Sequence, residues 1–381
     1  MPKENMLLFT ISMNNRSAVI IVVIMVGVLI ALTSITQKGV FTNTATFPEI
    51  ENIKKLKTTK EQSVELKKLL DRVGPLEAQE AMFRSGLPFT GETHLLIHVI
   101  GDYIYEKNGP DGLPLCREYF LSACYHGFII DTLADHGLEG IVEAMSKCRM
   151  APPGVMTQCV HASGHGFLAW HDYDLLKGLG MCDKLGEKVK DFTYFNCYDG
   201  VFMENFWGVH GGKPSEKRWF KEDEIYYPCT DKRIPEKYLN GCWANQATVI
   251  YQHYHGDLKK TAEACDNVGN ETYRDTCYNN LYRQIHPLTA GKKERVAMLC
   301  TNATGLARQN ECMLTNMVAF WSVGDRAMPF DLCNESKEPL RKECFNRLIG
   351  MIYYDYSALP QEKDFYCNKI LDKSYQDQCK K

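Results

Sequence analysis

The sequence lacks the short motifs that mark the large nucleotide-dependent and hydrolytic enzyme classes. Its 381 residues contain no P-loop, no GxGxxG fingerprint and no GxSxG nucleophile elbow, so phosphate cradles, dinucleotide sites and serine-hydrolase chemistry are disfavoured. The zinc-protease motif HExxH is absent as well. A net charge of -3 creates no basic field, and no helix-turn-helix, C2H2 or RNA-binding signature appears, so we expect no nucleic-acid partner.

The sixteen cysteines are never two to four residues apart, which is the spacing that zinc ligation by cysteine usually needs. They fall instead into eight successive pairs with internal separations of 8 to 15 residues. An even count at regular spacing predicts a disulfide framework, and such a framework requires an oxidising compartment. The predicted bridges are Cys116–Cys124, Cys148–Cys159, Cys182–Cys197, Cys229–Cys242, Cys265–Cys277, Cys300–Cys312, Cys333–Cys344 and Cys367–Cys379.

The cysteine pairs recur along the chain from about residue 90, mostly about 34 residues apart. This is the period of two-helix solenoid repeats such as the tetratricopeptide type. No segment has the pattern of a β-strand, so we predict an all-α fold of disulfide-stapled helical hairpins (α/α repeats). The likeness to tetratricopeptide repeats is one of length and helix pairing only, because the signature positions of that repeat are not matched. The hairpins are compatible with an open solenoid or a closed toroid.

One interval between cysteine pairs is longer than the others, at 47 residues, and the extra material lies at residues 208–228. An insertion in a repeat usually forms a loop on one face, often the binding face. A surface loop without function is the equal alternative.

The N-terminal region carries the long apolar run of the chain. Residues 1–16 form a short polar tail, and residues 17–37 contain no charge. About 20 such residues span a bilayer as a helix, so we predict a transmembrane signal anchor. Residues 38–90 are predicted to form a linker and an amphipathic stalk helix, and residues 91–381 a repeat ectodomain. The cysteines orient this single-pass protein with its C-terminal domain on the extracellular, periplasmic or lumenal side.

Histidines recur at helical spacing between residues 94 and 204. His94 and His98 are four residues apart, as are His161 and His165, and residues at this spacing share a helix face on which they can bind one metal ion. His126, like His161, follows the second cysteine of its pair by two residues. The candidate metal ligands are His94, His98, His126, His161 and His165, with Asp199 as the carboxylate.

The position two residues after the second cysteine changes along the chain. It is histidine or aspartate in the first three repeats and then becomes Ala244, Asn279 and Leu314. A uniform structural role predicts no such gradient, so the pattern favours a functional site in the N-terminal repeats. The competing interpretation is that each histidine is a hydrogen-bonded core residue.

Small and acidic residues accompany the candidate ligands. The glycines that follow them inside predicted helices are Gly127, Gly164, Gly166 and Gly200. Each costs roughly 1 kcal/mol relative to alanine in a helix, which indicates close helix approach or room for a ligand. Asp131 and Glu204 each lie seven residues after a cysteine, and we expect them to orient imidazoles rather than to bind the metal.

Two functions follow from these patterns. The first is a membrane-anchored, exported helical-repeat protein with a histidine-rich metal site, as a metal-dependent enzyme or as a metal-binding protein. Histidine with a carboxylate suits zinc, iron, copper or manganese as the cofactor. The alternative is a non-enzymatic extracytoplasmic interaction scaffold that binds a protein partner on its repeat surface. The membrane, contacted through the N-terminal helix, is a partner in both.

Overall fold

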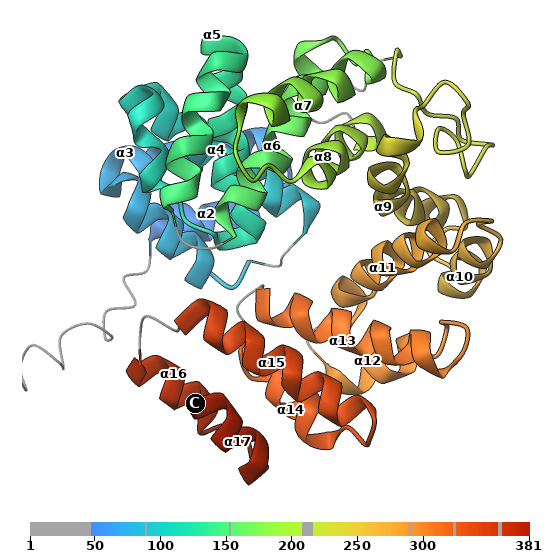
Figure 1. Ribbon diagram of the computed structural model, residues 1–381. Coiled ribbons are helices and arrows are strands. Elements are labelled where there is room, and N and C mark those ends of the chain that lie inside the picture. Colours follow the sequence, from blue (N-terminus) through green and yellow to red (C-terminus); the bar gives the residue numbers. More distant parts are fainter. Residues whose placement is uncertain are drawn as a thin grey trace, which may run out of the picture. The chain divides into compact units, whose positions relative to one another are not determined.

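The computed structural model describes residues 47–87, 90–151, 154–207, 216–289, 292–322, 325–356 and 360–381. In these ranges the regular structure is helical and contains no β-strand, which confirms the predicted all-α class (Figure 1). Every described helix belongs to one compact unit, Pro48–Lys381.

The helices of the first half are α2 (Pro48–Lys55), α3 (Thr59–Arg84), α4 (Gly91–Asn108), the 3₁₀ segment η1 (Gly109–Leu115), α5 (Tyr119–Met150), α6 (Val155–Trp170), α7 (Leu175–Lys188) and α8 (Tyr194–Trp207). Those of the second half are α9 (Glu236–His253), α10 (Leu258–Asp266), α11 (Glu271–Leu288), α12 (Lys293–Cys300), α13 (Leu306–Ser322), α14 (Met328–Glu335), α15 (Leu340–Tyr356), α16 (Pro360–Cys367) and α17 (Lys373–Lys380).

The predicted membrane anchor at residues 17–37 and the tail at residues 1–16 lie outside the described residues. Among the helices that the structure does describe, none combines the length and the apolar character that crossing a bilayer requires.

All sixteen cysteines form disulfides, and the predicted sequential pairing is confirmed at every bridge. The bridged Cα atoms lie 5.4 Å to 6.5 Å apart, within the ordinary range for a disulfide. From Cys265 to Cys344 each bridge joins a short helix to the longer helix that follows it, whereas Cys367–Cys379 joins two helices of 8 residues each. On the chain-entropy account, closing a loop of this size stabilises the fold by roughly 3 kcal/mol per bridge.

The first cysteine of a pair does not always lie in an α-helix. Cys116 follows η1, in which Pro110 and Pro114 lack the backbone N–H groups that a regular helix would use. Cys229 lies among turns directly after Pro228. In both places proline limits helix formation ahead of the cysteine.

The helix α5 combines parts of two repeats. It is 32 residues long, but its Gly137 has φ of 60°, which is left-handed backbone that glycine tolerates. The segment before Gly137 carries Cys124, and the segment after it carries Cys148. The two segments therefore correspond to the long helix of one hairpin and the short helix of the next.

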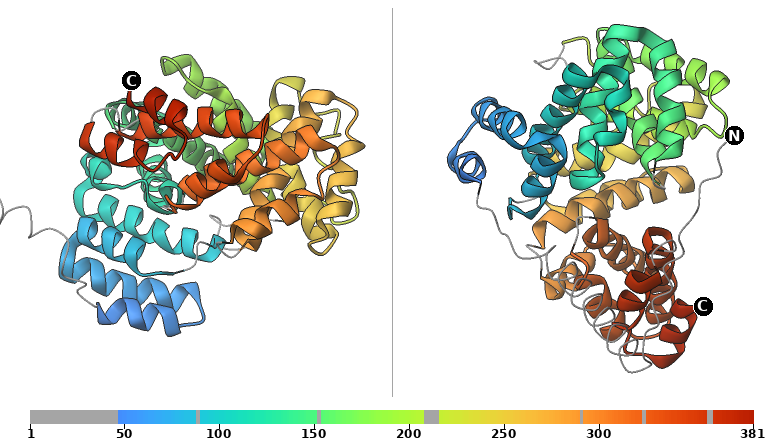
Figure 2. Two further views of the ribbon diagram at one scale, coloured as in Figure 1. Left: turned by 90° about the horizontal axis from the view of Figure 1, so that it is seen from below. Right: turned by 90° about the vertical axis from the view of Figure 1, so that its left-hand side faces the viewer.

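Successive long helices pack against one another. α4 contacts α5, α5 contacts α6, α6 contacts α8, α8 contacts α9, and the series continues through α11 and α13 to α15. The views in Figure 2 show the same order from two further sides. Packing between nearest neighbours is what a helical repeat predicts.

The segment that the sequence assigned to a stalk packs as part of the compact unit. α2 contacts α3, and α3 contacts α4. Ile53, Leu66 and Leu69 are fully buried. α3 is kinked where Gly74, directly before Pro75, has φ of 79°.

Candidate metal centre

Five histidines from three consecutive long helices lie together. α4 supplies His94 and His98, α5 supplies His126, and α6 supplies His161 and His165. Neighbouring ring centroids are 4.8 Å to 5.6 Å apart. The ring of His126 lies near both the α4 pair and the α6 pair, so it is the residue that joins the two halves of the cluster.

Glycines determine how closely the helices of the cluster approach. A Cβ atom at Gly127 would lie 2.3 Å from the backbone oxygen of His98, and one at Gly200 would lie 2.1 Å from that of His161. No residue with a side chain fits at such distances, so α5 meets α4, and α8 meets α6, through glycine. The close helix approach predicted from these glycines is confirmed.

The α4 half of the cluster is oriented by a backbone carbonyl. His94 Nδ1 lies 2.7 Å from the carbonyl oxygen of Phe120, and since a carbonyl only accepts, Nδ1 carries the proton. His94 Nε2 therefore presents a lone pair, and it lies 3.2 Å from His126 Nδ1. The backbone at Phe120 has φ of 53°, an unusual conformation for a residue with a bulky side chain.

His126 occupies the most enclosed position. Its side chain is 4% exposed, and its Nε2 atom is buried with no hydrogen-bond partner among the described residues. Burial, followed by the proximity of the other four histidines, lowers the pKa of His126 well below its ordinary value. The ring is therefore neutral at physiological pH, which is the form that binds metals.

His94, His98 and His126 form a group that could hold a metal ion. One ligand nitrogen from each lies within 4.8 Å of the other two. No larger group of histidine, cysteine and carboxylate side chains in the described ranges meets the same limit. Three imidazoles are a known donor set for catalytic zinc.

The α6 half of the cluster is a histidine pair fixed by two carboxylates. His161 Nδ1 lies 3.1 Å from Asp199 Oδ2, and His165 Nδ1 lies 3.1 Å from Glu204 Oε2. The two Nε2 atoms face each other at 3.0 Å. Each imidazole is thus held by its Nδ1 atom and presents Nε2 to its neighbour.

Both carboxylates are themselves held by hydrogen bonds. Tyr173 donates its hydroxyl proton to Glu204 Oε1 at 2.6 Å, and Asn245 donates to Asp199 Oδ1 at 2.8 Å. Burial pushes the pKa of Asp199 upward, but the hydrogen bond and charge of His161, with help from Arg283 and Asn245, lower it overall. Asp199 is therefore ionised at neutral pH.

Glu204 lies beside His165 Nδ1, the position in which the sequence suggested an orienting carboxylate. Asp199, which the sequence suggested as a metal ligand, lies in the corresponding position beside His161 Nδ1. Asp131 makes no hydrogen bond to an imidazole among the described residues, and burial and the negative charges of Asp135 and Glu106 raise its pKa. Sequence reasoning missed Tyr173, which lies in the turn after α6, and Asn245, which lies one residue beyond the register position of Ala244.

Among the other histidines whose side chains the structure describes, none joins the cluster. His253 and His255 are exposed, and His253 Nδ1 contacts the backbone oxygen of Glu222 at 3.1 Å. His171 follows α6 beside Trp170, and burial lowers its pKa.

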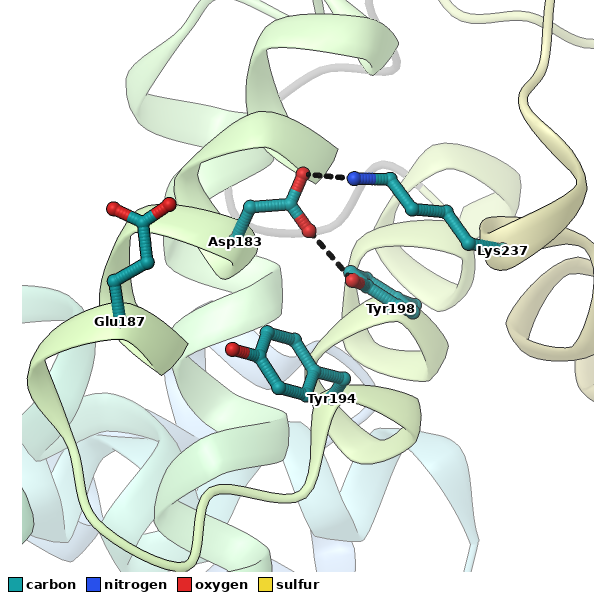
Figure 3. A pocket seen from close by; sticks show the side chains of 5 residues that line it. All are labelled: Asp183, Glu187, Tyr194, Tyr198 and Lys237. Carbon is teal, nitrogen blue, oxygen red and sulfur yellow. Dashed lines mark hydrogen bonds and ion pairs between the residues drawn. The ribbon is translucent and has the colours of Figure 1, made fainter.

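A pocket of about 450 Å³ lies apart from the cluster, between α7, α8 and the start of α9 (Figure 3). Its lining residues are Asp183, Glu187, Tyr194, Tyr198 and Lys237. Asp183 accepts hydrogen bonds from Tyr198 at 2.6 Å and Lys237 at 2.8 Å. Tyr238 donates to the same carboxylate at 2.5 Å, so Asp183 cross-links the three helices.

Comparison with models of known families, with curated proteins and with solved structures found no significant match to this chain. The chemistry of the cluster is therefore inferred from its own donor atoms, hydrogen bonds and burial.

Proposed function

We propose that this protein binds a transition-metal ion in its histidine cluster, with His94, His98 and His126 as the primary ligands. The observation that carries the proposal is the buried Nε2 atom of His126, which has no hydrogen-bond partner among the described residues. A buried polar atom without a partner costs about 1–3 kcal/mol. A metal ion that accepts the lone pair of this nitrogen removes the cost.

The donor set fits ions that prefer nitrogen ligands. Imidazole suits zinc, copper and iron, and nearby carboxylates extend the set to manganese. The lowered pKa of His126 keeps this ligand unprotonated, so the ion does not have to displace a proton from it near neutral pH. Bound there, an ion of this class supplies Lewis acidity or activates water.

The setting of the site is extracytoplasmic. Eight disulfides suggest an oxidising environment. We further propose that residues 17–37 form a single-pass membrane anchor and that the cluster lies on the oxidising side of the membrane. Protease accessibility of the full chain in intact and permeabilised membranes tests this topology, and cleavage of the repeats from the cytoplasmic side would contradict it.

Elemental analysis of the purified full chain tests the metal function. The chain is produced in an oxidising compartment, and a metal-free sample is reloaded separately with zinc, iron, copper and manganese. We expect the wild type to retain at least one equivalent of one of these metals and His126→Ala to retain much less. His253→Ala, which changes an exposed histidine outside the cluster, is the matched control and should load like the wild type.

A wild-type chain that takes up none of the four metals would refute the proposal. The histidines would then be hydrogen-bonded core residues, and the interaction scaffold would become the better account. Partner capture by the repeat surface would be the next measurement in that case.

A further inference from the structure

We infer that the cluster holds two metal ions rather than one, the second chelated by His161 Nε2 and His165 Nε2. This inference rests on the proposed metal function of the cluster and extends it to a dinuclear centre. It follows from the protonation of the two imidazoles, from the charge buried around them and from their distance to the first group.

The hydrogen bonds determine which nitrogens carry protons. A carboxylate oxygen accepts, so His161 Nδ1, which lies 3.1 Å from Asp199 Oδ2, is the donor. Glu204 Oε2 likewise accepts a hydrogen bond from His165 Nδ1. Tyr173 donates a hydrogen bond to the other oxygen of Glu204. In neutral imidazoles both Nε2 atoms then present lone pairs to each other at 3.0 Å. Two facing lone pairs repel unless a cation lies between them.

The buried carboxylates favour such a cation. Asp199 is 8% exposed and Glu204 is 0% exposed, and two carboxylates in such a site need positive charge close by. A divalent ion on the two Nε2 atoms supplies it through the imidazoles. Carboxylate, histidine and metal in line is the arrangement in which outer carboxylates orient and strengthen histidine ligands.

The distance between the nitrogens suits chelation. With metal–nitrogen bonds of about 2.0–2.1 Å, atoms 3.0 Å apart subtend an angle of roughly 90–100° at the ion. A tetrahedral angle requires only a few tenths of an ångström more. His161 and His165 are one helical turn apart, so a small rotation of either ring provides it.

One shared ion fits the geometry less well. Tetrahedral sites use four ligands, whereas five imidazoles converge here. The group whose nitrogens lie within 4.8 Å of one another stops at His94, His98 and His126. The rings of His161 and His165 are 5.5 Å and 5.6 Å from that of His126. Each half of the cluster therefore has its own converging nitrogens.

Zinc titration of the metal-free full chain, read as bound equivalents after gel filtration, tests the inference. Three chains are compared: the wild type, His161→Ala/His165→Ala and His94→Ala/His98→Ala. We expect two equivalents in the wild type and one in each double variant. One equivalent in the wild type, lost in both variants, would establish a single shared centre and overturn the inference while leaving metal binding intact. No zinc in any chain would overturn the two-ion inference, and the same result with iron, copper and manganese would refute metal binding itself.

Glu204→Gln provides a test with a gentler change. The amide keeps the size of the side chain but weakens its pull on the His165 proton. Loss of an orienting partner of this kind typically costs 10–100-fold in metal affinity, so we expect weaker binding of one equivalent and unchanged binding of the other. Equal weakening of both equivalents, or of neither, would contradict a separate site at His161 and His165.

Discussion

Gly164 of α6 and Cys197 of α8 meet backbone to backbone. A Cβ atom at Gly164 would lie 2.1 Å from the carbonyl oxygen of Cys197 and 2.8 Å from the backbone nitrogen of Val201. Gly164 also lies one residue before His165, so this contact positions the α6 half of the cluster. The packing of α6 against α8 and the geometry of the site therefore both depend on the absence of a Cβ atom at Gly164.

Gly164→Ala should separate α6 from α8 and destabilise the fold. Backbone atoms cannot move aside as a flexible side chain can, so we expect a loss of about 1–3 kcal/mol or more, as for overpacked cores. Thermal unfolding under oxidising conditions measures it. Gly180→Ala is the matched control, because Gly180 lies in the helix α7 with nothing within 4 Å of a new Cβ. There alanine should stabilise by up to about 1 kcal/mol. Equal effects at the two positions would contradict the close contact.

The eight disulfides should differ in how much of the fold is affected when each is removed. Cys367–Cys379 joins α16 to α17, the last described helix. The helix α17 packs against its neighbours α15 and α16. Cys182–Cys197 joins α7 to α8, which carries Asp199. Both loops are of similar length, so the chain-entropy term is roughly 3 kcal/mol for each.

Replacing both cysteines by serine at each bridge separates local from central effects. Without Cys367–Cys379 we expect faster proteolysis of α17 and unchanged metal content. Without Cys182–Cys197 we expect reduced metal content together with lower stability. Equal metal loss in the two variants would show that the bridges act on the whole chain rather than on their own hairpins.

Much of this architecture could be predicted from residue spacing. Cysteine pairing followed from separations along the chain because each bridge is local, and the histidines followed from helical periodicity because residues four apart share a face. The hydrogen bonds of Asn245 to Asp199 and of Tyr173 to Glu204 could not, because they join residues 31 to 46 positions apart through packing that no local pattern encodes. The continuity of α5 through Gly137 was missed for a related reason, since glycine at that point is equally compatible with a helix end.

Asp183 should make stability depend on pH. Burial raises its pKa, but hydrogen bonds from Lys237, Tyr198 and Tyr238 outweigh burial and lower the pKa below its usual 3.8. A lowered folded-state pKa stabilises the protein above the unfolded value, and the stabilisation is lost as pH falls through the folded value. Asp183→Asn should therefore cost about 1–3 kcal/mol at pH 6, and the difference from the wild type should shrink below about pH 4.

Denaturant unfolding of both chains between pH 7 and pH 2 measures this difference. Asp172→Asn is a suitable control, because Asp172 is exposed and forms an ion pair with the exposed Lys217. Such surface pairs contribute little to stability. A constant difference between Asp183→Asn and the wild type across the acid range would show that the Asp183 carboxylate does not stabilise the fold through its charge.

Removing the metal should lower the stability of the wild type more than that of a chain that lacks His126. A ligand that binds only the folded state stabilises it by about 2.7 kcal/mol at a free concentration 100 times its Kd. We therefore expect a chelator such as EDTA to lower the unfolding temperature of the zinc-loaded wild type by several degrees. Adding zinc back should restore it. The chelator should lower the unfolding temperature of His126→Ala by less than that of the wild type, because this variant lacks the ligand that joins the two halves of the cluster. His253→Ala should follow the wild type. If the chelator shifts His126→Ala as much as the wild type, the stabilising ion lies somewhere other than the histidine cluster.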